Sequence, residues 1–388
     1  MSVILAVDAG QTTKKFALFA NGSLCLECRF ELTETGCELV IRPSGSVQST
    51  ERLQTEDYGL ALEKVSTQVE SFLSSRRLSP LDGVVLSVTV PGTFFQSHAR
   101  IDQSYIDALK TKQSTVPHVV PALLRVIKQL QKSYPNVPLI AASNTAFYEN
   151  LPRYVKEYSF RSSEAKEFDM YRCGAHGLST HSVLSRLPKL VGRMPQRVLV
   201  CHIGSQVSVT AVKDGVAVDH TDATAGAETD CSILLQLMKS KNLRPSEAEL
   251  HLKTSAGLMG LADEVDFRRL LDRKAQGDEK AITALTYFSY HLQKAIAAGV
   301  IPLGGIDTVV LTGTAAVRSP ELRWIVLQGL SPIDVQVSQE RNEFLASKDG
   351  VISERKSPVQ VAVIRSDEMR EMAQIANSFV VSHSQSKP

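Results

Sequence analysis

The sequence lacks long apolar runs, a large excess of charge of either sign, and more than a modest share of aromatic residues, which make up 6% of the chain. A membrane-spanning helix needs about 20 mostly apolar residues in a row, so the sequence predicts no membrane partner. A formal net charge of +2 gives no field that would attract nucleic acid. The first residues also lack the charged and apolar regions of a signal peptide, which predicts a cytoplasmic protein.

Cysteine is scarce as well, with six residues in the chain. Cys25 and Cys28 have the spacing of half a zinc site, but no second pair of cysteine or histidine ligands follows them. They lie in a strand-like run, which favours ordinary reduced thiols over a metal site. The chain does contain 388 residues, 43% of them hydrophobic, which is enough for two globular cores.

The first part of the chain has the pattern of a strand, a polar loop and a second strand. A β-branched run at residues 3–7 leads into a polar segment, and the next apolar run ends at the turn dipeptide Asn21-Gly22. Residues 42–56 are polar and contain glycine, proline and serine, which predicts a surface loop. Hydrophobic spacing then predicts helices over 60–73 and 123–130, and strands over 84–90 and 138–142.

The opening pattern returns after a polar segment at about residues 150–167, which resembles a domain boundary. Residues 197–215 again have the pattern of strand, loop, strand and turn, which predicts two related halves. The remaining pattern predicts helices over 283–300 and 320–330, strands over 307–313 and 359–365, and a final helix that starts at Asp367. We therefore predict domains over 1–150 and 151–370, followed by a terminal helix and polar tail over 371–388.

The segment Asp8-Ala-Gly-Gln-Thr-Thr13 places one acid, two hydroxyls and several backbone amides on a tight turn. Such a turn can cradle a phosphate while the acid holds Mg²⁺, although a plain surface hairpin has the same signature. Its repetition near His202, and a further loop at Thr312-Gly313, favour the phosphate interpretation. The three turns together predict an α/β fold of two duplicated actin-like ATPase (ribonuclease H-like) domains with a nucleotide cleft between them.

Six segments, in order along nearly the whole chain, resemble the acetate kinase family. They are Asp8-Ala-Gly-Gln-Thr-Thr-Lys-Lys-Phe16, Asn144-Thr-Ala-Phe147, Arg172-Cys-Gly-Ala-His-Gly177, Cys201-His-Ile-Gly204 with Ser208-Val-Thr-Ala-Val212, Ser255-Ala-Gly-Leu-Met-Gly260, and Ile306-Asp-Thr-Val-Val-Leu-Thr-Gly313. Members of this family transfer a phosphoryl group from ATP to a carboxylate, usually acetate. The resemblance implies ATP and Mg²⁺ as cofactors, a small carboxylic acid as a further partner, and a homodimer joined through the C-terminal domain. The apolar helix over 283–300 fits such a dimer and equally fits a buried core helix.

The resemblance also implies roles for individual residues. Asp8 and Asp367 would lie near the metal, although Asp367 would equally serve as the N-cap of the last helix. His176 would lie in the phosphoryl-transfer cleft, although a lone histidine is more often structural. The residues implied to face the nucleotide are Thr12, Thr13, Lys15, His202, Gly204, Ser205, Ser208, Thr312, Gly313 and Arg318. Of these, Lys15 would equally be a solvated strand lysine, and Arg318 would stack on a base, contact phosphate or cap a helix.

Several catalytic positions of the family hold residues that cannot perform the same chemistry. Ser87 and Ala225 stand at its two arginine positions, and neither segment contains another arginine. Asn144 stands at the position of the catalytic aspartate, and an amide can neither take up a proton nor carry the charge. Ser205 and Gln206 replace an asparagine and a glycine of the second turn, where a side chain can crowd the phosphates.

These substitutions leave two hypotheses. The first is a pseudoenzyme, with catalysis impaired or absent, that keeps a binding role and that either holds ATP or does not. The second is an active ATP- and Mg²⁺-dependent kinase of altered specificity for acetate or another short-chain carboxylate. One transition-state arginine contributes a factor on the order of 10³ to 10⁵ to the rate of phosphoryl transfer, so the loss of two favours the first hypothesis. Such losses are rarely additive, which leaves room for residual activity.

Overall fold

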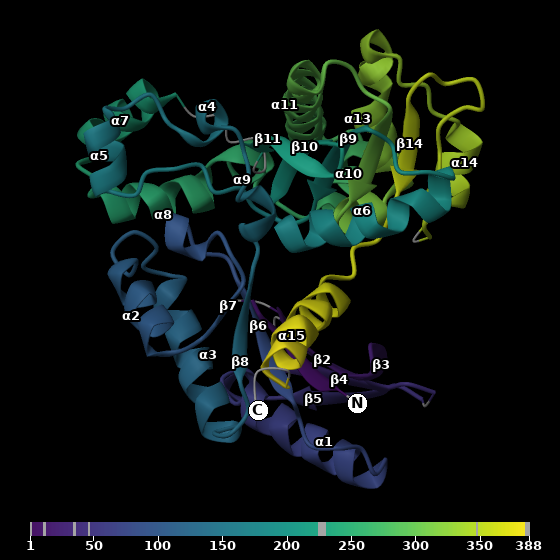
Figure 1. Ribbon diagram of the computed structural model, residues 1–388. Helices are drawn as coiled ribbons and strands as arrows, with labels where there is room; N and C mark the ends of the chain where they lie inside the picture. Colours follow the sequence, from purple (N-terminus) through teal and green to yellow (C-terminus); the bar gives the residue numbers. More distant parts are fainter. Residues whose placement is uncertain are drawn as a thin grey trace. The chain divides into compact units, whose positions relative to one another are not determined.

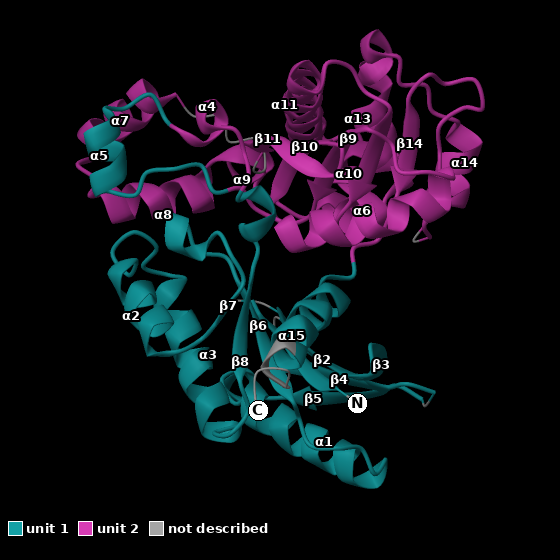
Figure 2. Cartoon of the chain, in the orientation of Figure 1, with its two compact units in different colours: residues 1–149, 158–173, 367–388 teal, residues 150–157, 174–366 magenta. Residues whose placement is uncertain are grey.

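The computed structural model describes residues 2–10, 13–33, 36–45, 47–223, 230–346 and 348–384. The chain divides into two compact units, each with its own sheet and its own hydrophobic core (Figure 2). Unit 1 contains residues 1–149, 158–173 and 367–388, and unit 2 contains residues 150–157 and 174–366. Both ends of the chain therefore belong to unit 1.

Unit 1 is built on an eight-stranded sheet in the order β5-β4-β3-β2-β1-β6-β8-β7 (Figure 1). The strands are β1 (Val3–Ala9), β2 (Thr13–Ala20), β3 (Ser23–Thr33), β4 (Gly36–Pro43), β5 (Ser49–Leu53), β6 (Gly83–Val88), β7 (Ala99–Arg100) and β8 (Leu139–Ser143). Strands β1 to β5 pair antiparallel in chain order, whereas β1, β6 and β8 run parallel. Parallel strands end at the same edge of a sheet, so the residues at the ends of β1, β6 and β8 are brought together.

Helices cover both faces of the central strands of unit 1. The longer helices are α1 (Ala61–Ser75), α2 (Gln103–Thr111), α3 (Val120–Ser133) and α15 (Glu368–Ser384), and α5 (Ser162–Glu167) is short. Leu62, Val65 and Val69 recur at helical spacing on α1 and are buried in the core of this unit. The last helix, α15, packs against β1 and β6. Because β1 is covered on both faces, Val3 to Val7 are all buried, as in a central parallel strand.

Unit 2 repeats this layout with a six-stranded sheet in the order β11-β10-β9-β12-β14-β13 (Figure 1). The strands are β9 (Arg197–Ile203), β10 (Val207–Lys213), β11 (Val216–Asp222), β12 (Thr308–Thr312), β13 (Gly350–Val351) and β14 (Gln360–Val363). Strands β9, β10 and β11 pair antiparallel, and β9, β12 and β14 run parallel. The predicted strand–loop–strand repeat is therefore present in both units.

The helices of unit 2 are α4 (Arg153–Lys156), α6 (Gly177–Val191), α7 (Cys231–Lys241), α8 (Pro245–Ser255), α9 (Gly257–Ala262), α10 (Phe267–Ala275), α11 (Glu279–Leu303), α12 (Thr314–Arg318), α13 (Pro320–Leu327) and α14 (Gln339–Phe344). α11 packs against β9 and β10 and buries Phe288, Leu292 and Ile296. At Gly299 an added Cβ would lie 2.6 Å from Leu199, so glycine allows the helix to approach β9 closely. Within the described part of the chain, no helix is both long and apolar enough to cross a membrane.

The structure differs from the sequence predictions in three places. β5 is a strand inside the segment 42–56, which the sequence predicts to be a loop. Its side chains are mostly exposed and give no hydrophobic pattern, and the strand is defined by its backbone pairing to β4. α11 continues through Pro302, which is tolerated in a last turn that ends at Gly304 in a left-handed conformation. The unit boundaries also differ from the predicted domains, since α15 packs on β1 and residues 158–173 join unit 1.

Candidate functional site

The carboxyl end of β1 carries Asp8, which pairs with Lys15 on β2. One carboxylate oxygen of Asp8 lies 3.9 Å from the Lys15 ammonium, and the two side chains are 31% and 44% exposed. Burial has the largest effect on the pKa of Asp8 and raises it. The smaller effects, in decreasing order, are those of Lys15, which lowers the pKa, of Glu368, which raises it, and of a hydrogen bond from Ser87, which lowers it. A cation bound beside Asp8 would favour its ionised form, so the position is electrostatically suited to a metal.

Ser87, Thr89 and Asn144 meet at the ends of β6 and β8. Asn144 directly follows β8, and its backbone N–H donates to the carbonyl of Val88 at 2.8 Å. Its side-chain Nδ2 donates to Ser87 Oγ at 3.2 Å and to Thr89 Oγ1 at 2.9 Å. Two of the substituted catalytic positions are therefore joined in one neutral, hydrogen-bonded cluster.

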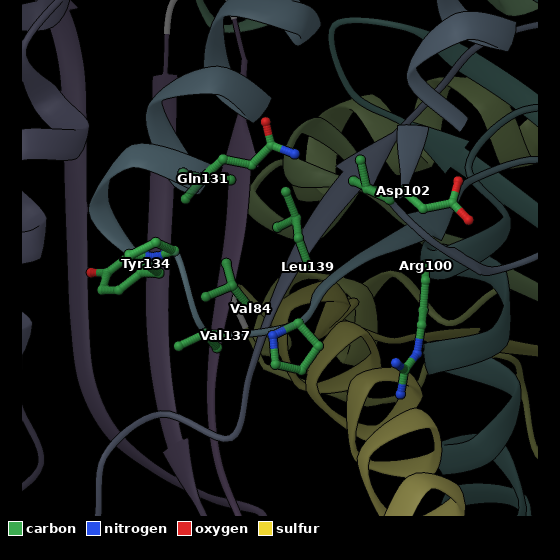
Figure 3. Close-up of a pocket in the computed structure, with 11 residues that line it drawn as sticks. Val84, Arg100, Asp102, Gln131, Tyr134, Val137 and Leu139 are labelled. Carbon is green, nitrogen blue, oxygen red and sulfur yellow. The ribbon is translucent and has the colours of Figure 1, made fainter. Parts of the chain in front are cut away.

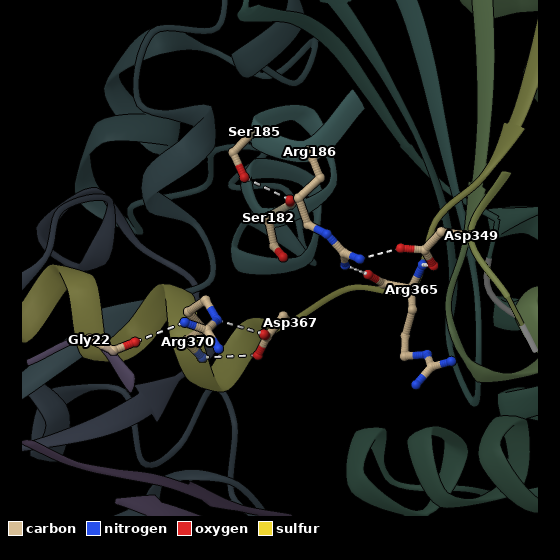
Figure 4. Close-up of polar contacts among 8 residues, drawn as sticks. All are labelled: Gly22, Ser182, Ser185, Arg186, Asp349, Arg365, Asp367 and Arg370. Carbon is tan, nitrogen blue, oxygen red and sulfur yellow. Dashed lines mark hydrogen bonds and ion pairs between the residues drawn. The ribbon is translucent and has the colours of Figure 1, made fainter. Parts of the chain in front are cut away.

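Asp367 lies at the N-terminus of α15. Its Oδ1 accepts a hydrogen bond from the backbone N–H of Arg370 at 3.2 Å, and its Oδ2 accepts one from Arg370 Nε at 3.0 Å (Figure 4). Arg370 also donates to the carbonyl of Gly22 at 2.8 Å, which ties α15 to the β2–β3 turn. Asp367 thus has the geometry of an N-cap, and its neighbour Glu368 is the residue whose charge acts on Asp8. Sequence reasoning missed Glu368, although it is adjacent to the predicted metal residue.

The polar turn after β1 is tied to a short 3₁₀ helix, η1 (Thr55–Tyr58). The Tyr58 hydroxyl donates to the carbonyl of Gly10 at 2.8 Å. Lys14 Nζ donates to the Tyr58 carbonyl at 2.5 Å and lies 4.0 Å from the centre of its ring. Thr13 begins β2, whereas Thr12 lies outside the described residues.

In unit 2, His176 lies at the N-cap of α6 with a left-handed φ of 59°. Its Nδ1 lies 2.9 Å from Ser208 Oγ, and its ring stacks on His202 with centroids 4.0 Å apart and an interplanar angle of 7°. Burial lowers the pKa of His176 to about 3; His202 and His220 act in the same direction, and Asp222 opposes them. The ring is therefore neutral at neutral pH. Its Nε2 has no hydrogen-bond partner among the residues that the structure describes.

The pairing of β9 with β10 sets the positions of His202 and Ser208, which are opposite each other in register. The Nδ1 of His202 lies 2.9 Å from Ser179 Oγ on α6, so α6 anchors both stacked rings. A backbone hydrogen bond of 3.0 Å donated by Gly204 closes the β9–β10 turn, and Ser205 is exposed at its tip. A Cβ at Gly204 would lie 3.1 Å from His202 Nε2, so glycine leaves room beside that ring.

The end of β12 lies beside the end of β9. Thr312 pairs with His202 and is fully buried. Gly313 has a φ of +86°, and an added Cβ there would lie 2.4 Å from the carbonyl oxygen of Ile203, so the close approach of the two backbones requires glycine. Arg318 is exposed at the C-terminal end of α12 and forms no ion pair or hydrogen bond with the described residues.

The structure thus brings predicted residues together within each unit. Unit 1 gathers Asp8, Lys15, Ser87 and Asn144, and unit 2 gathers His176, His202, Ser208 and Thr312. Ala225, like Thr12, lies outside the described residues. Sequence reasoning missed Thr89, Ser179, His220 and Glu368, whose roles depend on contacts between strands and helices that are distant in the sequence.

Cys25 and Cys28 both contact the core of unit 1, and the pairing of β3 with β2 is irregular at Cys25. Cys28 is buried together with Leu26 and Phe30, while Cys25 is only partly covered. None of the six cysteines, all of which lie in the described part of the chain, forms a disulfide. Within the described residues, no cluster of three or more histidine, cysteine, aspartate or glutamate side chains is arranged to hold a metal ion.

A pocket of about 280 Å³ lies elsewhere in unit 1 (Figure 3). Val84 and Leu139, at the starts of β6 and β8, form part of its wall, together with Tyr134 and Arg100. The candidate residues of unit 1 lie at the opposite, carboxyl ends of these strands, where ligands bind in open α/β sheets. The pocket is therefore separate from the candidate site.

Two sheets that each open with an antiparallel hairpin and continue in parallel strands define a two-domain actin-like ATPase fold. Solved structures support this assignment. An acetate kinase from Porphyromonas gingivalis matches with a TM-score of 0.83 and 22% identity, over 98% of this chain and 100% of that chain. A propionate kinase from Francisella tularensis subsp. tularensis SCHU S4 matches with a TM-score of 0.85 and 23% identity, over 97% of this chain and 100% of that chain. The predicted fold class is confirmed.

Sequence comparison identifies the family within this fold. The pattern of the acetokinase family matches residues 3–374. The acetate kinase of Bacillus subtilis (strain 168) is 26% identical over 384 residues, which span 95% of this chain and 97% of that protein. The acetate kinase of Macrococcus caseolyticus (strain JCSC5402) is 27% identical over 395 residues, which span 98% of this chain and 99% of that protein. The chain belongs to the acetokinase family, as its motifs predicted.

Proposed function

We propose that this chain is a nucleotide-binding member of the acetokinase family whose phosphoryl-transfer activity is strongly impaired. The observation that carries the proposal is the neutral cluster of Ser87, Thr89 and Asn144 at the strand ends of unit 1. A phosphoryl group in transfer carries negative charge on its oxygens, and enzymes stabilise that charge with cations. A hydroxyl and an amide supply no positive charge, and neither is a general base at neutral pH.

The expected loss of rate is large. One arginine that contacts the transferred group contributes on the order of 10³ to 10⁵ in rate. Ser87 and Ala225 stand at two such positions of the family, and Asn144 stands at the position of its aspartate. Because losses within one catalytic set are not additive, we do not multiply them and expect a rate at least about 10³-fold below that of an acetate kinase.

The residues of unit 1 fit a nucleotide-bound Mg²⁺. Mg²⁺ in such sites is usually held by one or two carboxylates together with phosphates and water, and the charge of the Glu368 carboxylate acts on the Asp8 carboxyl group. Mg²⁺ would neutralise part of the phosphate charge when ATP is bound. Thr13 and Lys15, which follow the polar turn, would bind phosphate oxygens, and Asp367 would cap α15 and thereby position Glu368.

His176 would act as a neutral hydrogen-bonding group. When the Ser208 hydroxyl donates to Nδ1, the proton of the ring is on Nε2, which can then donate to an oxyanion. The stacked His202 ring and the burial of His176 disfavour a second proton. His176 would therefore orient a phosphate without supplying the positive charge that the two arginines supply elsewhere in the family.

A second candidate function is an active kinase of altered specificity for acetate or another short-chain carboxylate. The presence of Asp8, Lys15, Glu368 and His176 favours it, because carboxylates can bind Mg²⁺ while an ammonium and an imidazole can contact phosphate. In either case we propose a homodimer formed through the C-terminal part of the chain, as the family implies, and sedimentation at micromolar concentration would test it.

The proposal is tested by trapping acyl phosphate with hydroxylamine in the presence of ATP, Mg²⁺ and a panel of acetate, propionate and butyrate. We expect hydroxamate to form at least about 10³-fold more slowly than with an acetate kinase assayed in parallel. Hydroxamate that forms within about tenfold of the rate of that enzyme, and disappears in the His176→Ala variant, would contradict the proposal. Calorimetric titration with ATP and Mg²⁺ tests the binding role separately, and the absence of binding at millimolar nucleotide would refute that part.

A further inference from the structure

His220, on β11, lies next to the segment that leads into α6, and it is 1% exposed. Its Nε2 accepts a hydrogen bond from the backbone N–H of Ala175 at 3.2 Å, and the same nitrogen lies 3.2 Å from Asp222 Oδ1. Its Nδ1 lies 3.1 Å from Thr210 Oγ1. One ring nitrogen therefore has two partners of opposite character, a hydrogen-bond donor and a carboxylate acceptor.

The protonation of Nε2 decides which of these two partners is bound. A backbone N–H can only donate, so Ala175 requires a bare Nε2, and the proton of the neutral ring is then on Nδ1, where Thr210 can accept it. An ionised carboxylate can only accept, so Asp222 requires a protonated Nε2. The two bonds exclude each other. Because the Asp222 side chain is 61% exposed, water can satisfy its carboxylate, which favours the bond to Ala175 while the ring is neutral.

The bond to Ala175 holds the turn that carries His176. Gly174 and His176, on either side of Ala175, both have a left-handed backbone, with φ of 72° and 59°. A residue other than glycine is uncommon in this conformation, and neighbouring contacts are needed to hold it. On the helix side, the His176 carbonyl accepts a hydrogen bond from the Thr180 N–H at 2.9 Å. His220 anchors the turn on the side away from the helix.

The register of β11 places His220 on the face of the sheet that turns away from α11. Thr210 is the residue opposite His220 on β10. Its two neighbours, Val209 and Ala211, lie in the core that includes α11, and successive strand residues point to opposite faces. The titratable and charged groups around the ring are those of β11, of the stacked histidines and of α4, which packs against β11: Asp219, Asp222, His176, His202, Arg153 and Lys156. Of these groups, Asp222 places a carboxylate oxygen within hydrogen-bond distance of Nε2.

We infer that His220 is a positioning residue for His176, and that a proton taken up from water on its Nε2 exchanges the bond to Ala175 for one to Asp222 and releases the turn. The protonated Nε2 would also face the Ala175 N–H, so that two donors oppose each other. The inference rests on the proposed function only in placing His176 at a phosphate-binding end of unit 2. It adds a dependence on pH that His176 itself does not provide, since burial lowers the pKa of that ring to about 3.

Three variants separate the ring proton from the fold. His220→Gln keeps an oxygen that can accept from Ala175 but takes up no proton, so the turn should stay anchored at every pH. Asp222→Asn keeps the ring and removes the carboxylate, so proton uptake on Nε2 should occur about 0.5 pH unit lower, the size expected for one exposed ion pair. Asp214→Asn is the matched control, because it removes the same charge from the exposed turn of the β10–β11 hairpin and should change nothing.

The test is NMR of the histidine rings and of the Ala175 backbone amide, on the full chain without nucleotide, in a titration from pH 8 to pH 5. At pH 8 we expect the ring proton of His220 on Nδ1. Proton uptake on Nε2 should then shift the Ala175 amide and the His176 ring in one step, and the Ala175 step should vanish in His220→Gln. Circular dichroism confirms that each protein stays folded across this range.

Three results would each overturn the inference: a proton on Nε2 of His220 at pH 8, no proton uptake by His220 down to pH 5, or a step at the Ala175 amide that persists in His220→Gln. An Ala175 step at the same pH in Asp222→Asn as in the wild-type chain would refute the part assigned to the carboxylate. Because no nucleotide is present, an absence of ATP binding would contradict the proposed function without affecting this titration.

Discussion

Acidification should weaken the folded chain, and His176 should account for a measurable part of that loss. The pKa of His176 is lowered from its ordinary 6.5 to about 3 in the folded chain, chiefly by burial. The unfolded chain therefore binds a proton at this position at a higher pH than the folded chain does. The contribution of His176 to the free energy of unfolding is therefore constant above about pH 6.5. It is lost progressively as the pH falls from 6.5 toward 3.

The size of the effect follows from the difference in pKa. A full difference of about 3.5 units corresponds to about 4.8 kcal/mol at 1.36 kcal/mol per unit. At pH 4.5 only the unfolded form is protonated to a large extent, which gives about 2.7 kcal/mol. The imidazole is only partly buried, so solvent reduces the effect, and we expect about 2 kcal/mol.

The assay is urea-induced unfolding at pH 7, 6, 5 and 4.5 for the wild-type chain and for His176→Gln. Glutamine keeps hydrogen-bonding capacity at the site but does not titrate. The stability difference between the two proteins should change by about 2 kcal/mol in favour of the variant between pH 7 and pH 4.5. His118→Gln, which replaces an exposed histidine, serves as the control and should show no such change. Parallel pH profiles for the wild-type chain and His176→Gln would refute the reasoning.

Two further predictions concern the turns and the last helix. Gly313→Ala should lower the free energy of unfolding by about 3 kcal/mol or more, because the added methyl group would collide with the Ile203 carbonyl. Gly215→Ala is the control, because Gly215 has a φ of +82° but no atom within 4 Å of an added Cβ. In thermal unfolding it should lower the free energy of unfolding by only about 1 kcal/mol. Asp367→Ala should lower the free energy of unfolding by about 1 kcal/mol, because it removes an N-cap, and should leave the affinity for Mg²⁺–ATP intact. Glu368→Gln should instead weaken that affinity about 10-fold in calorimetry, with little effect on stability. The opposite pattern would assign the metal to Asp367.

The sequence was sufficient to predict the duplicated fold. The β-branched run of β1 and the run of β9 each precede a polar turn and a second strand, and this local pattern is visible without any tertiary contact. The short strand β5 could not be predicted in the same way, because its side chains are exposed and only its backbone pairing defines it. The return of α15 to unit 1 is likewise a contact between residues more than 300 positions apart, such as Arg370 with Gly22.

The candidate site was predictable in its residues but not in their geometry. The motif around His176 indicated its position, yet the stacking on His202 depends on the register of β9 against α6. Asp367 and Glu368 are adjacent carboxylates, and only the start of α15 shows which one caps the helix and which one acts on Asp8. The hydrogen bonds from Asn144 to two hydroxyls depend on how β6 and β8 align, which no local pattern encodes.

A rate comparison is the most direct way to establish whether this chain keeps the acetokinase scaffold without most of its catalytic activity. The forward rate of acetyl phosphate formation is measured with saturating ATP, Mg²⁺ and acetate for this chain and, side by side, for the acetate kinase of Bacillus subtilis. We expect a rate at least about 10³-fold lower for this chain, with any residual rate unaffected by the choice of short-chain acid. A rate within about tenfold of the reference enzyme, abolished by His176→Ala, would contradict it.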